Sequence, residues 1–201
     1  MRSNQTATPA SYTAAQSLTG LAPGGAAPAL PTTRGGRAAG PLLVGATVAM
    51  GLMAGLFFAF DVSVMPGLAA GDDATYVTAM QHINKAIDGN GLFGLVFLGA
   101  FLATGVAAWL QHRAGRRQAA LWAAAGTALY LVALIVTMGV NIPLNNELAA
   151  AGDAAQIHDL AAVRAKFADT WVPVNMLRTA LCTGGLLALT RSLVLHGRAG
   201  R

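Results

Sequence analysis

The chain has 201 residues, of which 55% are hydrophobic and only 10% are charged, and its mean hydropathy is +0.54. Because a soluble domain carries about 25% charged residues, this composition excludes an ordinary soluble protein and favours an integral membrane protein. The net charge is +5, and the basic residues lie at the ends of apolar runs, a distribution that does not indicate nucleic-acid binding. The single cysteine, Cys182, excludes an internal disulfide framework.

Residues 1–40 are rich in Ala, Gly, Pro, Ser and Thr and contain neither an acidic residue nor a long apolar run. Such a segment cannot bury enough apolar surface to offset its ordering entropy, so we predict a disordered tail. Its extreme N-terminus lacks the short apolar core of a signal peptide, and we therefore expect the first apolar run to be retained as a span.

Four apolar runs are each long enough to cross a bilayer, which takes about 20 helical residues. Pro66 and Pro143 follow the first and third runs and are expected to end them. The sequence therefore predicts an all-α fold, a four-helix transmembrane bundle within a membrane domain over residues 41–196, followed by a short tail at 197–201. The predicted spans are residues 42–65, 91–110, 119–142 and 171–195.

Basic and acidic residues are separated between the two sides of the predicted spans. Nine arginines precede the first span, connect the second to the third or follow the fourth, and no acidic residue accompanies them. The positive-inside rule makes this side cytoplasmic, so we expect both termini in the cytoplasm and the protein in the cell membrane. The two longer loops, residues 66–90 and 143–170, are then extracytoplasmic.

Both long loops contain helical patterns. In the first loop Asp72 is a good helix start, and apolar residues recur at helical spacing from Tyr76 to Ile87. A weaker pattern covers residues 157–167. We expect two amphipathic helices that cover the outer mouth of the bundle.

Two charged side chains, Asp61 and Arg178, lie in the outer halves of the spans, where a charge is costly and must face protein or water. Asp61 lies about one helical turn, and Arg178 about two turns, inside the outer end of its span. Because Asp61 is the only acid in any predicted span, we expect an ion pair between the two. The pair could merely hold two helices in register, or Arg178 could bind or act on a ligand.

Amide side chains occur at the same depth. Asn141 ends the third span, and Asn175 precedes Arg178 by three residues on the same helix face. These groups predict a polar site at the outer mouth, although amides near helix ends also join helices or cap the backbone. The candidate substrate-binding residues are Gln81, Asn84, Asn141, Asn145, Asn146, Trp171 and Asn175.

The candidate catalytic residues are His82, Asp61 and Arg178. His82 is the histidine whose position at the mouth and ordinary pKa range suit a general base, although it could equally be a solvated residue on the polar helix face. The chain has no pair of histidines four residues apart and no cysteine cluster, and Cys182 lies in an apolar helix. We therefore expect neither a metal nor a cofactor.

Four segments carry a family resemblance, and they occur in the family's order. They are GLMAGLFFAFDVSVMPGL (51–68), AMQHINKAI (79–87), NIPLNNEL (141–148) and WVPVNMLRT (171–179). Together they resemble the anthrone oxygenase-like family of small four-span membrane proteins, from about Leu43 to Leu189. The family-like positions are Met65, Pro66, Gln81, Asn84, Asn141, Pro143, Leu144, Asn145, Asn146, Trp171, Asn175 and Arg178.

The resemblance implies an activity that a few family members possess, the oxidation of anthrones to anthraquinones by dioxygen without metal or flavin. His82 or Asp61 would be the base, and Arg178 with Asn175 would stabilise the enolate oxygen. Aromatic residues would contact the flat rings in a dry pocket. The candidates for this contact are Phe57, Phe58, Phe60 and Trp171.

Two other functions remain open. The bundle could bind a lipophilic molecule or assist a membrane partner without catalysis. A small transporter fits less well, because the polar residues do not continue into the cytoplasmic halves of the spans. The expected partners are the lipid bilayer and a lipophilic small molecule, and the sequence gives no indication of the oligomeric state.

Overall fold

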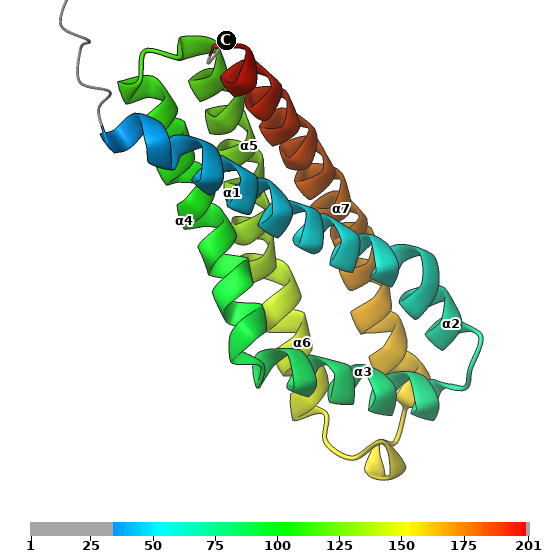
Figure 1. Cartoon of the computed structure of the whole chain (residues 1–201). Coiled ribbons are helices and arrows are strands. Elements are labelled where there is room, and N and C mark those ends of the chain that lie inside the picture. Colours follow the sequence, from blue (N-terminus) through cyan, green and yellow to red (C-terminus); the bar gives the residue numbers. More distant parts are fainter. Residues whose placement is uncertain (1–33, 200–201) are drawn as a thin grey trace, which may run out of the picture. The chain divides into compact units, whose positions relative to one another are not determined.

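The computed structural model describes residues 34–199, and these residues form helices joined by short turns, with no strand (Figure 1). Residues 1–33 of the predicted disordered tail and the last two residues of the chain lie outside this range. The elements are α1 (Arg34–Ala59), η1 (Phe60–Val64), α2 (Met65–Ala69), α3 (Asp73–Asp88), α4 (Gly91–Arg113), α5 (Arg117–Val136), η2 (Thr137–Asn141), α6 (Ile142–Ala150), η3 (Ala154–Gln156) and α7 (Leu160–Arg198).

Four continuous helical segments in the described part of the chain are long and apolar enough to cross a membrane. They carry large apolar side chains on their outer surfaces, for example Leu95 and Ile135, which are more than 60% exposed. Apolar surface of this extent is suited to lipid rather than water. The chain is therefore a multi-pass membrane protein, as predicted, and the segments are Ala38–Ala69, Gly91–Arg113, Arg117–Ala150 and Leu160–Arg198.

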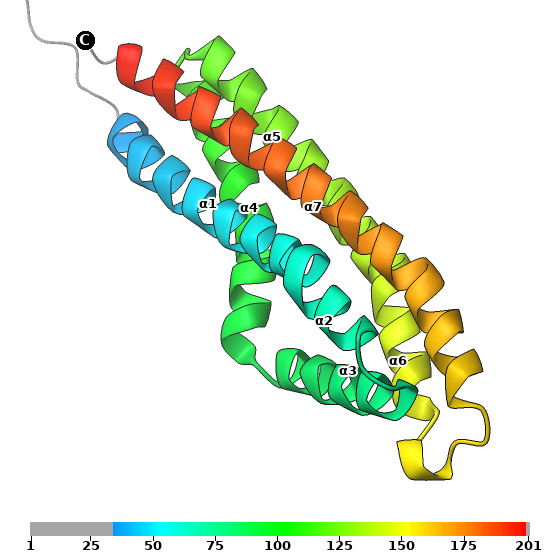
Figure 2. The same ribbon diagram turned by 90° about the vertical axis from the view of Figure 1, so that its right-hand side faces the viewer.

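The four segments close into a bundle (Figure 1 and Figure 2). The helix α7 packs against α1 and α5, and α4 packs against the other sides of α1 and α5. The helices α5 and α7 approach each other closely at two glycines, where a methyl group on Gly126 would lie 3.1 Å from the carbonyl oxygen of Gly185. Small residues permit such close packing of helix backbones in lipid.

The first and third spans differ from the prediction at their ends. Pro66 and Pro143 do not end the helices, which continue as α2 and α6. Each proline instead follows a π-helical turn, η1 or η2. Proline lacks the N–H that an α-helical turn requires, and a wider turn is one way in which a helix accommodates this loss. The two π turns place Phe60 and Asn141 in the interior, where both are buried.

We call the end of the bundle that carries α2, α3, α6 and η3 the loop end. The predicted amphipathic helix of the first loop is α3, which crosses this end and contacts α2, α4, α6 and α7. The second predicted loop helix is not separate but forms the first turns of α7. Asp159 caps this helix by accepting the N–H of Ala162 at 2.9 Å. The ring of Phe167 packs edge-on against Tyr76 of α3, and the ring of Trp171 packs against Phe60 of η1, so both hold the extension against the bundle.

Arg164 ties the start of α7 to the turn between α2 and α3. Its guanidinium pairs with Asp73 at 2.8 Å and donates hydrogen bonds to the carbonyl oxygens of Ala69 and Gly71. It also lies over the ring of Tyr76 at 4.7 Å. Burial of the Tyr76 hydroxyl raises its pKa, and the charge of Arg164 opposes this effect. One cation and its acceptors thus join the start of α7 to the turn between α2 and α3.

The close contact between α5 and α7 can be tested with an added methyl group. We expect Gly126→Ala to lower the stability of the bundle by about 1–3 kcal/mol, because the methyl group meets the backbone of α7 and the helices must separate. Thermal unfolding in detergent would measure the change.

The matched control is Gly45→Ala, because a methyl group at Gly45 meets nothing within 4 Å. This substitution should leave stability unchanged or raise it by up to about 1 kcal/mol through helix propensity. Equal effects of the two substitutions would contradict the close contact.

Candidate functional site

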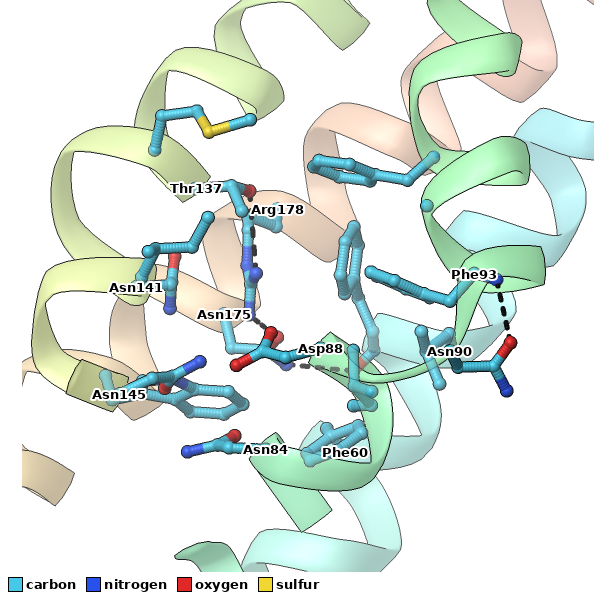
Figure 3. Close-up of a pocket in the computed structure, with 18 of the residues that line it drawn as sticks. Phe60, Asn84, Asp88, Asn90, Phe93, Thr137, Asn141, Asn145, Asn175 and Arg178 are labelled. Atoms are coloured by element: carbon cyan, nitrogen blue, oxygen red, sulfur yellow. Dashed lines mark hydrogen bonds between the residues drawn. The ribbon is translucent and has the colours of Figure 1, made fainter. Parts of the chain in front are cut away.

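A cavity of about 240 Å³ lies inside the loop end and is walled by parts of all four spans and by α3 (Figure 3). We call it the inner cavity. Its aromatic wall consists of Phe57, Phe60, Phe93, Phe97 and Trp171. Its polar lining consists of Asn84, Asp88, Asn90, Thr137, Asn141, Asn145, Asn175 and Arg178. An apolar pocket with a few converging polar groups is the usual form of a small-molecule site, and this volume is slightly below the range of about 300–1,000 Å³ common for such pockets.

Arg178 is the central charged group of the inner cavity and is only 5% exposed. Its guanidinium lies over the rings of Phe57 at 4.3 Å and Trp171 at 5.2 Å. It donates to Asn175 Oδ1 at 2.6 Å and makes a long contact of 3.5 Å with Thr137 Oγ1. These contacts fix the position of the guanidinium, but they do not neutralise its charge.

Asp61 and Arg178 do not form the ion pair that the sequence predicted. The Asp61 carboxylate instead accepts hydrogen bonds from Asn175 Nδ2 and Thr179 Oγ1. The same Nδ2 also donates to the carbonyl oxygen of Phe57 at 2.9 Å, while Oδ1 of Asn175 accepts from Arg178. The amide therefore stands between the two charges. The direct pair does not form because the guanidinium turns toward the aromatic wall, whereas Asp61 lies behind Asn175.

Three side chains of the inner cavity have buried polar atoms without a hydrogen-bond partner among residues 34–199. These atoms are Asn84 Nδ2, Arg178 Nε, and both Nδ2 and Oδ1 of Asn141. Buried polar groups almost always have a partner, and each unpaired group costs about 1–3 kcal/mol. The three side chains come from α3, η2 and α7 and converge on one cavity (Figure 3). They match a ligand that has oxygen atoms at more than one position.

A second depression of about 880 Å³ lies between α3, α6 and η3, and we call it the vestibule. Asn84, Asp88 and Asn145 line both the vestibule and the inner cavity, so the two spaces adjoin. Gln81 lies at the vestibule and joins α3 to the end of α6, because its amide donates to the carbonyl oxygens of Leu148 at 2.8 Å and Gly152 at 3.0 Å.

The structure separates the predicted site residues into three groups. His82 is exposed in the vestibule and does not line the inner cavity. Asp61 contacts the cavity only through Asn175. The residues at the inner cavity are Asn84, Asn141, Asn145, Trp171, Asn175 and Arg178, and those at the vestibule alone are Gln81, His82 and Asn146.

Within the inner cavity Asn145 has a positioning contact, because its Oδ1 accepts the indole N–H of Trp171 at 2.9 Å. Phe58, which the sequence placed among the aromatic contacts, is 55% exposed on the outside of the bundle. Phe93 and Phe97 from α4 take its place in the wall.

The sequence analysis missed Asp88. This residue ends α3 four positions after Asn84 and therefore lies on the same helix face. That spacing is the signal in the sequence that could have identified it. Two residues after Asp88, the side chain of Asn90 accepts the N–H groups of Leu92 and Phe93 and so begins α4.

Among comparisons with known proteins, a family model described as anthrone oxygenase matches residues 84–188, which are 105 of the 201 residues. The matched range begins in α3, contains α4, α5 and α6 and ends in α7. It therefore includes the polar residues of the inner cavity from Asn84 to Arg178. None of the curated proteins and none of the solved structures matches the chain.

The bridge through Asn175 predicts different effects for two substitutions of Asp61. Asp61→Asn keeps an oxygen that accepts one of the two hydrogen bonds, whereas Asp61→Ala leaves the Asn175 amide and the Thr179 hydroxyl without an acceptor. We expect Asp61→Ala to cost about 1–3 kcal/mol and Asp61→Asn clearly less. Thermal unfolding in detergent measures both. Equal losses would mean that the charge of Asp61 is required and that the amide bridge is not the essential link.

Proposed function

Because the chain belongs to the anthrone oxygenase family, we propose that it is a membrane enzyme that oxidises a flat, anthrone-like molecule with dioxygen in its inner cavity. The observation that carries the proposal is the convergence of three buried, unpartnered polar side chains on a cavity with an aromatic wall. Such groups require a ligand that is apolar over most of its surface and has oxygen atoms at its edges.

An anthrone has this form and is also a weak carbon acid. Its central ring carries a methylene carbon on one side and a carbonyl carbon on the opposite side. Loss of a methylene proton gives an enolate, which can reduce dioxygen without a cofactor. In the overall reaction one CH₂ group and one O₂ molecule give one C=O group and one water molecule. The protein must supply a flat slot, a stabiliser for the enolate oxygen and a base.

The aromatic wall supplies the flat slot. One aromatic pair, Phe60 and Trp171, comes from η1 and α7 with ring centroids 5.6 Å apart. A second pair, Phe93 and Phe97, is stacked on α4 at 5.5 Å. Rings of this kind contact other flat rings by offset or edge-to-face packing. The wall thus favours a polycyclic aromatic substrate over a flexible lipid chain.

Arg178 is the proposed stabiliser of the enolate oxygen. Asn175 orients its guanidinium, and its Nε remains a free donor. A fixed cation in an apolar cavity interacts strongly with negative charge that develops during the reaction. Asn84 and Asn141 have further free polar atoms, which would bind ring hydroxyl or carbonyl groups.

We also propose that both termini are cytoplasmic, on the basis of the arginine distribution, so that the vestibule opens on the outer side of the cell membrane. Leu98 and Met138 line the inner cavity and are each about half exposed on the outside of the bundle. A lipophilic substrate could therefore enter sideways from the bilayer.

The role of Arg178 is tested by offering a hydroxylated anthrone to purified protein and measuring oxygen consumption and anthraquinone formation. We expect turnover above spontaneous oxidation. Arg178→Ala should reduce kcat by about 10²-fold or more, because the enolate oxygen loses its fixed donor. Arg178→Lys should recover only part of the rate, because lysine lacks the planar fork that Asn175 orients.

Arg113→Ala is the matched control, because Arg113 also lies over a tryptophan, Trp109, at 5.1 Å but lines neither the inner cavity nor the vestibule. It should keep the wild-type rate. Saturable binding of the anthraquinone without any turnover would mean that the protein binds a lipophilic ligand and is not an enzyme. Absence of both binding and turnover would overturn the proposal.

The orientation predicts which turns are accessible in intact cells. Cys182, the only native cysteine, is buried, so a single new cysteine can be labelled selectively. A thiol reagent that does not cross membranes should label Ala150→Cys in intact cells and Ala114→Cys only after permeabilisation, since the two exposed positions lie at opposite ends of the bundle. The reverse pattern would invert the topology.

A further inference from the structure

We propose that Asp88 is the general base of the inner cavity, which takes the proton from the methylene carbon of the substrate. This inference rests on the function proposed above and names the residue that begins the reaction. Neither base suggested by the sequence lines the inner cavity, because His82 lies in the vestibule and Asp61 lies behind Asn175. A base must come within hydrogen-bonding reach of the proton that it removes.

The other acidic residues are excluded by their contacts or by their position. Six of the eight acids have a carboxylate that is already bonded. Asp61 accepts hydrogen bonds from Asn175 and Thr179. Asp73 pairs with Arg164, and Glu147 pairs with Lys166. The remaining three accept backbone N–H groups at the starts of helices, and they are Asp72, Asp153 and Asp159.

Asp88 and Asp169 remain, and within residues 34–199 neither forms an ion pair or a side-chain hydrogen bond. Both residues are exposed, but Asp169 lies on α7 and lines neither space. Asp88 lines both the inner cavity and the vestibule, and its carboxylate is turned into the cavity (Figure 3).

The position of Asp88 in α3 is unfavourable for a structural role. It is the last residue of the helix, where the free carbonyl groups carry partial negative charge and oppose a carboxylate. A basic or amide side chain would be more stable at this position. An acid that is destabilising for its own helix, yet turned into a cavity, is better explained by the chemistry of that cavity.

In the proposed complex the substrate lies between the two charged residues of the inner cavity. Asp88 comes from α3 and Arg178 from α7, and they line the same cavity without forming an ion pair. In an anthrone the methylene and carbonyl carbons lie on opposite sides of the central ring. A molecule seated between the two residues can therefore present its acidic C–H to Asp88 while its oxygen accepts from Arg178.

The proton transfers balance with a single carboxylate. Asp88 takes one methylene proton, and the enolate donates an electron to dioxygen. The two radicals combine to form a C–O bond, and the resulting peroxide anion takes the proton back from Asp88. Asp88 then removes the second C–H proton while the O–O bond breaks, and the hydroxide that leaves takes this proton to become water. Asp88 ends as a carboxylate, and the vestibule is the exit for the water.

The test compares Asp88→Asn with Asp88→Glu and with the exposed acid variant Asp169→Asn, each as full-length protein in detergent. Turnover of the anthrone and binding of the anthraquinone are measured separately. We expect Asp88→Asn to lose about 10²–10⁴-fold in kcat, the usual contribution of a general base. It should still bind the anthraquinone, whereas Asp88→Glu should recover part of the rate and Asp169→Asn should retain all of it.

A further readout distinguishes a base from a positioning residue. Deuteration of the methylene group should slow the wild-type reaction, because the C–H bond breaks at Asp88. The other titratable or charged groups that line the two spaces are Arg178, His82, Lys85 and Asp153, so His82→Gln is included to show that the loss of turnover belongs to Asp88.

The outcomes are distinct. An active wild type with an equally active Asp88→Asn variant would overturn the role of Asp88 and leave the proposed function standing. The same conclusion follows if His82→Gln removes turnover while Asp88→Asn keeps it, or if Asp88→Asn loses binding and turnover together. A wild type with no turnover above spontaneous oxidation would overturn both proposals.

Discussion

A buried guanidinium in the apolar interior is the constraint on which the loop end of this bundle depends. Removing Arg178 from water costs several kcal/mol, and the cost must be offset by hydrogen bonds and by the faces of aromatic rings. Phe57 and Trp171 supply the rings, and Asn175 supplies the main acceptor. Because Asn175 is itself held by Asp61 and by the backbone of α1, the guanidinium joins α1 and α7.

The space beside Arg178 exists because two helices are not regular at this depth. Pro66 and Pro143 each follow a π turn, and the residues of these turns form part of the cavity wall. A regular α-helix would rotate the following side chains differently and would bring the backbones into even packing. The close contact between α5 and α7, at Gly126 and Gly185, lies where both helices are regular. The bundle is therefore tightly packed at its middle and open at its loop end.

The polar groups of the inner cavity serve two different purposes. Asn145 and Asn175 orient Trp171 and Arg178 through their hydrogen bonds. Asn84, Asn141 and Arg178 retain atoms with no partner among the described residues, and the carboxylate of Asp88 forms no ion pair or side-chain hydrogen bond within the same range. The first group holds the site in shape and the second is free for a bound molecule. In the function that we propose, the acid and the cation of this cavity would serve the C–H and the oxygen of one carbon acid.

Hydropathy, the spacing of polar residues and the family motifs were sufficient to predict the four spans, the amphipathic helix α3 and the group of amides around Arg178. These features depend on composition and helical spacing within one segment, which are visible in the chain itself. They could not predict that Asn175 separates Asp61 from Arg178, that His82 lies in the vestibule, or that Phe93 and Phe97 replace Phe58 in the wall. Those outcomes depend on how each helix is rotated against its neighbours and on the π turns before Pro66 and Pro143. Periodicity shows which residues share a helix face, and only the packed bundle decides what that face meets.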